Sequence, residues 1–276
     1  MNKRLLVALG VLCALAILIV VLQYRQPAKV APSRSLDNQM TSSSNLSRMW
    51  LRTLDNRTVF TPDEDIHVFV YIDSHNEPVT GFDVVLESNI ADLKIEKATV
   101  IHSSFELKQT GALQLTGFLP LEGGSTGVTL KEEPVAELIF KRTQMGPIIL
   151  KVLAEKGETR DSNVVAVEPP GDTLGAAEGT TVYVGKQIPL SLNWPPHPFE
   201  GAALTLTRID KPSQPCADCS TKAHVTFSAN NKTHELIFSS GGITGLPSEA
   251  QKVEGYVIEQ DPHPDESFGI VIARDL

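Results

Sequence analysis

Apolar and polar residues follow two different patterns along this chain. Residues 5–22, from Leu5 to Leu22, are apolar without interruption, whereas from Met49 onward apolar and polar residues alternate over short stretches that end at Gly, Pro, Asn or Asp. An apolar run of this length can cross a bilayer as a helix, and alternation with a period of two is typical of strands with one buried face. The pattern therefore predicts an all-β body behind one N-terminal transmembrane helix.

The alternation predicts a first β-sandwich over residues 49–167. Its clearest strand is expected at residues 66–72, where Ile66, Val68 and Val70 share one face. Further short strands are expected at 82–86, 93–95, 113–115, 135–140, 148–152 and 164–167. Many short strands at regular spacing, separated by turn residues and without long amphipathic helices, are typical of a sandwich.

A second β domain is predicted over residues 181–276. Residues 168–180 are rich in Pro and Gly and are interpreted as a linker between the two domains. Beyond this linker, apolar residues alternate strictly over residues 188–194, up to Trp194, and again in several later stretches. The number of alternating stretches predicts a small immunoglobulin-like or fibronectin-like sandwich.

The N-terminal segment is interpreted as an uncleaved signal-anchor, residues 1–24, followed by a flexible linker, residues 25–48. Lys3 and Arg4 precede the apolar run, as in a signal sequence, and no small-residue cleavage site follows it closely. Basic residues are nearly balanced on the two sides, so charge alone does not decide the orientation. The polar spacer and the β-rich body favour a single-pass protein of the cell membrane with its C-terminal domains extracytoplasmic.

Charge argues against one class of partner. The 276 residues contain 24 Lys and Arg and 33 Asp and Glu, which gives a formal net charge of −9. The first 34 residues carry five of the basic residues and no acid, so the remainder of the chain carries −14. Nucleic-acid-binding proteins usually present a basic surface, and we therefore expect no nucleic acid partner.

Several stretches of the first β domain form a recognisable series. Residues 61–65 precede the first long strand, and PVTGFDVVL at 78–86 forms the next. Glycine-rich residues 123–127 are followed by VAELIFK at 135–141 and GPIIL at 146–150. This series resembles a cohesin-type domain, of the kind related to carbohydrate-binding sandwiches. Residues 87–93 depart from the family, which tends to have a Tyr-Asp-Pro turn there. The resemblance implies a jelly-roll sandwich that binds a protein module or a glycan without catalysis.

Cys216 and Cys219 form a C-x-x-C sequence in a Pro-rich stretch between two expected strands. A structural disulfide is the favoured interpretation, because the domain is expected outside the cytoplasm. Thiol-redox chemistry is an alternative, but it favours a cysteine at a helix N-terminus. Zinc is a third, because His224 and His234 follow, although their spacing is not that of a zinc finger.

Carboxylates precede the first long strand at Asp63, Glu64 and Asp65. Clustered carboxylates suit calcium, but no complete calcium-loop motif is present, so a solvated loop is favoured. We expect no metal and no cofactor, and Asp63, Asp65 and His224 are the weak metal candidates.

Trp194, His197 and Phe199 form the least ordinary surface candidate, because prolines separate these aromatic residues. Aromatic side chains held by prolines can stack on a sugar or on a Pro-rich peptide. The alternation that places Trp194 with Leu192 favours the plainer interpretation, in which Trp194 ends a strand and faces the core.

No catalytic motif is present: there is no G-x-S-x-G, H-E-x-x-H, P-loop or G-x-G-x-x-G sequence. We therefore expect a binding or scaffolding protein that is not an enzyme and whose partner is a cell-surface protein or polysaccharide. Protein binding is favoured, a carbohydrate-binding surface module is the alternative, and a thiol-redox or metal protein is the second alternative. An exposed row of planar aromatic rings would favour the glycan, and a mixed apolar and polar sheet face would favour the protein.

Overall fold

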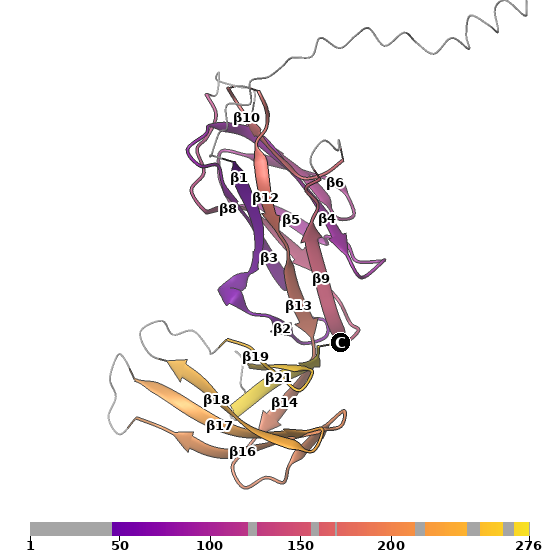
Figure 1. Ribbon diagram of the computed structural model, residues 1–276, viewed down its shortest axis with the longest axis vertical. Helices are drawn as coiled ribbons and strands as arrows, with labels where there is room; N and C mark the ends of the chain where they lie inside the picture. The colour runs from indigo at the N-terminus through magenta and orange to yellow at the C-terminus, as the bar shows by residue number, and fades with distance from the viewer. Residues whose placement is uncertain are drawn as a thin grey trace, which may run out of the picture. The chain divides into compact units, whose positions relative to one another are not determined.

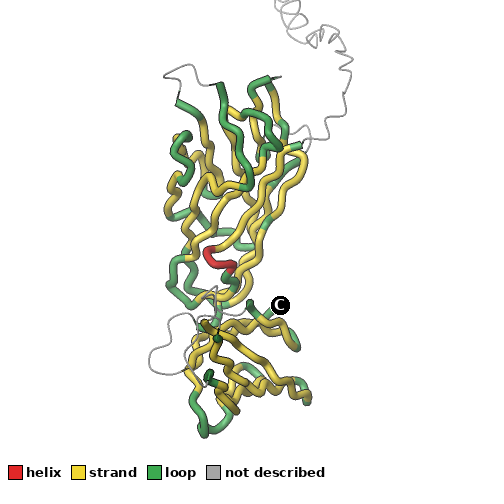
Figure 2. The backbone as a smooth tube through the Cα atoms, turned by 90° about the vertical axis from the view of Figure 1, so that its left-hand side faces the viewer, coloured by secondary structure: helices red, strands yellow, loops and turns green. Residues whose placement is uncertain are grey.

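The computed structural model describes residues 46–120, 126–155, 160–168, 170–212, 219–241, 249–261 and 268–275, which belong to one compact unit. The regular elements in these ranges are β-strands (Figure 1), apart from one 3-10 turn at Leu54–Asn56 (Figure 2). The all-β prediction is therefore confirmed. The predicted anchor, residues 1–24, and most of the predicted linker, residues 25–48, lie outside the described residues. Within the described ranges, no helix has the length and hydrophobicity needed to cross a membrane.

The first sandwich is built from two sheets. Sheet 1 has the strand order β12-β1-β3-β8-β5, and sheet 2 has the order β11-β10-β4-β9-β13-β2, with β7 and then β6 added beside β4. The strands of sheet 1 are β12 (Leu174–Glu178), β1 (Ser47–Thr53), β3 (Ile66–Asp73), β8 (Glu133–Phe140) and β5 (Lys97–Val100). The strands of sheet 2 are β11 (Gly171–Asp172), β10 (Asn163–Ala166), β4 (Val79–Ser88), β9 (Gly146–Val152), β13 (Thr180–Val184), β2 (Val59–Phe60), β7 (Gln114–Phe118) and β6 (Glu106–Gly111).

The core of this sandwich is formed by alternate residues of its strands. In β3, Ile66, Val68, Val70 and Ile72 are all buried, as the sequence predicts, and they belong to the same apolar cluster as Phe82 of β4. The residues between them are only half-buried, because successive side chains of a strand point to opposite faces of the sheet. This alternation leaves each sheet with an outer face that is free to carry other chemistry.

The segment predicted as a linker, residues 168–180, contains strands. β12 pairs in parallel with β1, and β13, which begins at Thr180, pairs with β9. Gly and Pro indicated a linker here, but the small side chains belong to an edge strand that passes from sheet 1 to sheet 2. Gly179 lies at the crossing, where a Cβ atom would overlap the carbonyl oxygen of Leu150. The linker prediction is therefore corrected.

The second sandwich begins after Gly185, the single residue between β13 and β14. It has two four-stranded antiparallel sheets, with the orders β14-β21-β20-β19 and β15-β16-β17-β18. Its strands are β14 (Lys186–Leu190), β15 (His197–Phe199), β16 (Ala202–Asp210), β17 (Ser220–Ala229), β18 (Lys232–Gly241), β19 (Gln251–Val253), β20 (Tyr256–Gln260) and β21 (Phe268–Arg274). A separate apolar core fills it. The predicted start of this domain, residue 181, is the second residue of β13 (Thr180–Val184), which belongs to the first sandwich.

A third, small apolar cluster joins the two sandwiches. It contains Val59 and Tyr183 from the first sandwich and Val257, Val271 and Ala273 from the second. Strands β20 and β21 are therefore buried on both faces, which explains why their residues show little alternation in exposure. Apolar contact on this second face fixes the junction by the same burial that forms each core.

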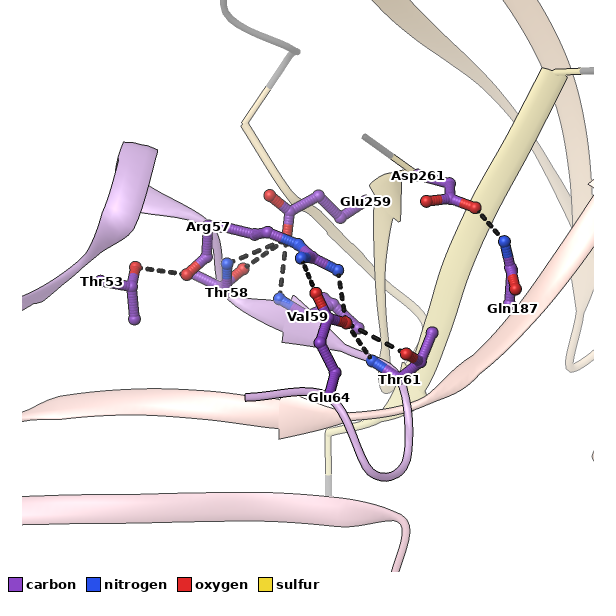
Figure 3. Close-up of polar contacts among 9 residues, drawn as sticks. All are labelled: Thr53, Arg57, Thr58, Val59, Thr61, Glu64, Gln187, Glu259 and Asp261. Atoms are coloured by element: carbon purple, nitrogen blue, oxygen red, sulfur yellow. Dashed lines mark hydrogen bonds and ion pairs between the residues drawn. The ribbon is translucent and has the colours of Figure 1, made fainter. Parts of the chain in front are cut away.

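Polar contacts reinforce this junction (Figure 3). Glu259 of β20 accepts hydrogen bonds from the backbone amides of Thr58 and Val59, at 2.9 and 2.7 Å. Burial raises the pKa of Glu259 above its ordinary value, and the hydrogen bonds from Thr58 and Val59 offset only part of that rise. Beside it, Arg57 pairs with Glu64, and burial raises the Glu64 pKa less than the hydrogen bonds from Arg57 and Thr61 lower it.

Candidate functional site

The outer face of β10, β4, β7 and β6 is the first candidate surface. Strand register places its outward residues in cross-strand rows, one of which runs Asn163, Asp83, Thr116, Lys108 over all four strands. The neighbouring row contains Val165, Gly81, Phe118 and Glu106, and a third contains Val85 and Gln114. We call these outward residues the Asp83 face.

The centre of the Asp83 face is a hydrogen-bonded polar row. Thr116 Oγ1 donates to Asp83 Oδ1 at 2.5 Å, and Asn163 Nδ2 donates to Asp83 Oδ2 at 3.0 Å. Both carboxylate oxygens of Asp83 are therefore engaged by neighbouring strands, which fixes the side chain before any ligand arrives. Preorganised polar groups lose less conformational entropy on binding than mobile ones.

A concavity lies beside this row. Asp83, Gln114, Arg160, Asp161 and Asn163 are among the residues that line it. The Oδ1 atom of Asn163 is buried and has no hydrogen-bond donor among the described residues. A buried acceptor without a partner is costly, so a donor from a ligand would gain by entering here.

Apolar side chains flank the polar row. Val85 and Val165 are half-buried, and Phe118 is 39% exposed. Described residues supply no aromatic neighbour for Phe118 within stacking distance, so the face carries no planar aromatic row. It is the mixed apolar and polar type of surface that is typical of protein interfaces.

The outer face of sheet 1 carries stacked aromatic and arginine side chains, unlike the Asp83 face. Trp50 of β1 stacks on Tyr71 of β3, with ring centroids 5.7 Å apart and planes 12° apart. The guanidinium groups of Arg48 and Arg52 lie over the indole, and only 7% of Trp50 is exposed. Trp50 therefore lies on the outer face of the sheet, where neighbouring side chains bury it.

The three speculative binding residues of the second sandwich do not form one surface. β14 ends at Leu190, and the chain then turns, with the Trp194 amide donating to the Ser191 carbonyl at 3.3 Å. Trp194 is 52% exposed, which contradicts the alternation that placed it in the core, whereas Phe199 is buried and packs edge-on against Tyr256. His197 is half-buried at the start of β15. Trp194 remains the exposed member of this group.

The described residues include only one of the two cysteines for which a disulfide is predicted. Cys219, which directly precedes β17, is disulfide-bonded. Cys216 lies outside the described residues, so the pairing of these two cysteines stays a prediction.

The weak metal candidates have other roles in the structure. Asp65 pairs with Lys141 at 3.0 Å, and Asp63 occupies a turn with a φ of 68°. His224 is 95% buried, with Nδ1 3.0 Å from a Glu235 oxygen and Nε2 2.9 Å from an Asp210 oxygen. Both ring nitrogens thus face carboxylates on opposite sides of the ring. Across the described residues, no three His, Cys, Asp or Glu side chains converge as a metal site would require.

Sequence reasoning missed most of the Asp83 face. Asp83, Thr116 and Asn163 give no local signal of their own in the sequence. Their outward position follows from the alternation of each strand, but the row that they form depends on which strands are neighbours. The local sequence pattern does not determine the order of strands in a sheet.

No protein-family model matches this chain, and no curated protein matches it. Several solved structures are similar to about half of it. The third ScaB cohesin of R. flavefaciens, in complex with a group 1 dockerin, is 16% identical, covers 52% of this chain and 98% of its own, and has a TM-score of 0.40. The seventh ScaB type I cohesin of Pseudobacteroides cellulosolvens is 13% identical, with coverages of 54% and 98% and a TM-score of 0.38.

A non-cellulosomal cohesin from Archaeoglobus fulgidus is 13% identical, covers 51% of this chain and 92% of its own, and has a TM-score of 0.35. These neighbours belong to the family that residues 49–167 resemble in sequence. Identities this low and TM-scores below 0.5 give no evidence about the ligand of this chain.

Proposed function

We propose that this chain is a membrane-anchored extracytoplasmic protein that binds a protein partner without catalysis, through the Asp83 face. The observation that carries the proposal is the fixed row Asn163–Asp83–Thr116 with an unpaired buried acceptor, Asn163 Oδ1, beside a concavity. A partner that donates a hydrogen bond to Asn163 Oδ1 removes an existing energetic cost, which makes the contact specific.

A protein suits this face better than a polysaccharide does. The face is a four-stranded sheet surface with Phe118 exposed at one side and Val85 and Val165 between polar groups. Protein interfaces combine apolar contacts with oriented polar groups, whereas glycan binding relies on exposed aromatic faces. Among the described residues of the first sandwich, the one stacked aromatic pair is Trp50 with Tyr71, which lies on the other sheet and is covered by arginines.

The location is proposed from the sequence. The apolar residues 5–22 are long enough to anchor the chain in a bilayer. A disulfide at Cys219 is consistent with an oxidising compartment, because disulfides are rare in the cytosol. The polar residues after the anchor then separate the acidic body from the membrane surface.

Site-specific photo-crosslinking tests the proposal. The full chain carries a photoreactive amino acid at Val85, on the Asp83 face, or at Ile237, which is 42% exposed on the second sandwich. After illumination in cell envelopes, we expect a discrete protein adduct from position 85 and none from position 237. A dockerin is one purified probe to add, because the sequence resembles cohesins. Adducts of equal yield at both positions, or retention of polysaccharide without a protein adduct, would refute the proposal.

A carbohydrate-binding function is the second candidate, and the exposure of Trp194 favours it. An exposed indole next to Pro195 and Pro196 is a rigid apolar surface on which a sugar ring can stack. Affinity electrophoresis in gels that contain cell-wall polysaccharides tests this candidate. Retardation of the wild-type chain that disappears in Trp194→Ala, but not in Ile237→Ala, would support it.

A further inference from the structure

The outer face of sheet 1 carries a cluster that the proposed function does not use. Arg48, Trp50 and Arg52 are alternate residues of β1, so they project from the same face, and the register sets Trp50 opposite Tyr71 of β3. The Asp83 face belongs to the other sheet of the sandwich. Any ligand of this cluster is therefore held by residues that the Asp83 face does not contain.

Two cations share one indole in this cluster. The Cζ atoms of Arg48 and Arg52 lie 5.6 and 5.9 Å from the Trp50 ring centroid, and Arg52 also lies 5.8 Å from that of Tyr71. A guanidinium stacked on aromatic rings keeps its N–H groups in one plane and one place. Such an arginine has already lost much of the side-chain entropy that binding an anion would cost.

Other charged side chains close to Trp50 on this face have partners among the described residues, whereas Arg52 does not. Arg48 pairs with Glu178 at 3.2 Å, and on β3 His67 pairs with Glu137 and Asp73 with His75. Arg52 has no carboxylate within ion-pair distance in the part of the chain that the structure describes. Its guanidinium is therefore held in place and available for an opposite charge.

The Trp50 side chain gives independent evidence that this cluster lacks a polar partner. Its side chain is 93% buried, yet its Nε1 has no hydrogen-bond acceptor among the described residues. A buried indole N–H normally finds an acceptor. An acceptor-rich ligand that reaches Nε1 would satisfy this donor as well.

We propose that this cluster is a second docking site for an acidic segment of a protein partner. One carboxylate of that segment pairs with the guanidinium of Arg52. The Arg48–Glu178 pair shows the geometry of such a contact within the chain itself. That pair is exposed, with side-chain exposures of 45% and 65%, so it is weak and can be exchanged for a ligand carboxylate. Arg, Trp and Tyr are also the residues that most often dominate the binding energy of protein interfaces.

Binding of labelled poly-L-glutamate to the detergent-solubilised full chain tests this proposal by fluorescence anisotropy. Residues 35–276 carry −14, so general attraction of a polyanion by the folded body is excluded and binding there needs a local site. We expect binding that weakens with salt and becomes about tenfold weaker in Arg52→Met, because hydrogen bonds between charged groups are the strong ones. Arg52→Lys keeps the charge but loses the planar fork, so it should restore only part of the affinity.

Lys97→Met is the matched control, because Lys97 is exposed on the opposite edge strand of the same sheet. It should leave the affinity unchanged. The proposal is overturned if poly-L-glutamate does not bind, or if Arg52→Met and Lys97→Met weaken binding equally. Binding of polygalacturonate with no binding of poly-L-glutamate would overturn the peptide as the occupant. None of these outcomes bears on the Asp83 face, whose residues are unchanged in every variant.

Discussion

The carboxylate of Glu259 accepts a hydrogen bond of 2.7 Å from the backbone amide of Val59, which lies 200 positions earlier in the chain. Val59 belongs to β2 of the first sandwich, and Glu259 belongs to β20 of the second. The same oxygen also accepts from the Thr58 amide at 2.9 Å. One buried side chain therefore holds the edge of the first sandwich against the second, next to an apolar cluster that includes Val59 and Val257.

Removing the Glu259 carboxylate should destabilise the fold. In Glu259→Ala the amides of Thr58 and Val59 lose their acceptor at a buried site, which costs about 1–3 kcal/mol. Glu259→Gln keeps one acceptor oxygen and should cost less. Urea unfolding of the full chain measures both, with Glu178→Ala as the control, because Glu178 is an exposed carboxylate in a weak ion pair. Equal stability of Glu259→Ala and the control would contradict this role.

The same residue predicts a pH dependence of stability. The pKa of Glu259 is raised from 4.5 by burial, so the folded state binds its proton more tightly than the unfolded state does. Its contribution is therefore complete below pH 4.5 and is lost as the pH rises through the raised value. The stability difference between wild type and Glu259→Gln should shift against wild type over that window in a series of urea unfolding curves.

Glu64 should give stability the opposite pH dependence in the same experiment. Its pKa is held below 4.5 by hydrogen bonds from Arg57 and Thr61, which outweigh the effect of burial, so its contribution is present above pH 4.5 and is lost on acidification. The difference between wild type and Glu64→Gln should shrink as the pH falls. A difference that does not change with pH for either variant would show that these carboxylates are not perturbed as the structure indicates.

Gly179 should resist substitution where Gly171 does not. A Cβ at position 179 would overlap the Leu150 carbonyl at the point where the chain passes between sheets, whereas nothing lies within 4 Å of one at position 171. Crowding of this kind in a packed region typically costs about 1–3 kcal/mol. Thermal unfolding of Gly179→Ala and Gly171→Ala compares the two positions directly. If both variants melt at the wild-type temperature, the crossing does not depend on glycine.

The two tryptophans should differ in their access to solvent. Trp194 is 52% exposed and Trp50 only 7%. Acrylamide should therefore quench most of the fluorescence of Trp50→Phe, in which Trp194 remains, and little of that of Trp194→Phe. The reverse order would contradict both the exposed turn after β14 and the arginine cover over Trp50.

Alternation in the sequence was enough to predict the all-β body and the buried face of β3, because burial acts on every second residue of a strand. Alternation did not predict the structure where a strand ended or where pairing with a distant strand decided the outcome. Leu192 and Trp194 continue the alternation of β14 but follow its end at Leu190, so they are exposed. Residues 174–178 resemble a linker in composition, yet they form an edge strand because β1 offers them a backbone partner.

The candidate site was harder to predict than the fold. Asp83, Thr116 and Asn163 come from three strands that are separated by 33 and 80 residues along the chain. Nothing in the local pattern brings them together, since the pairing of β4 with both β7 and β10 is a property of the whole sheet. The same holds for Arg52 and Tyr71, which meet only through the register of β1 and β3.

The most direct test of the central claim uses the partner that is captured at position 85. Its dissociation constant is measured for the wild type, for Phe118→Ser and for Ile237→Ser. These two apolar residues are 39% and 42% exposed, but only Phe118 lies on the Asp83 face. Truncation of an aromatic residue that a partner buries can cost about 2 kcal/mol or more, so we predict binding about tenfold weaker or worse for Phe118→Ser. Ile237→Ser should bind as wild type does. Unchanged affinity in Phe118→Ser, or an equal loss in both variants, would contradict the assignment of protein binding to the Asp83 face.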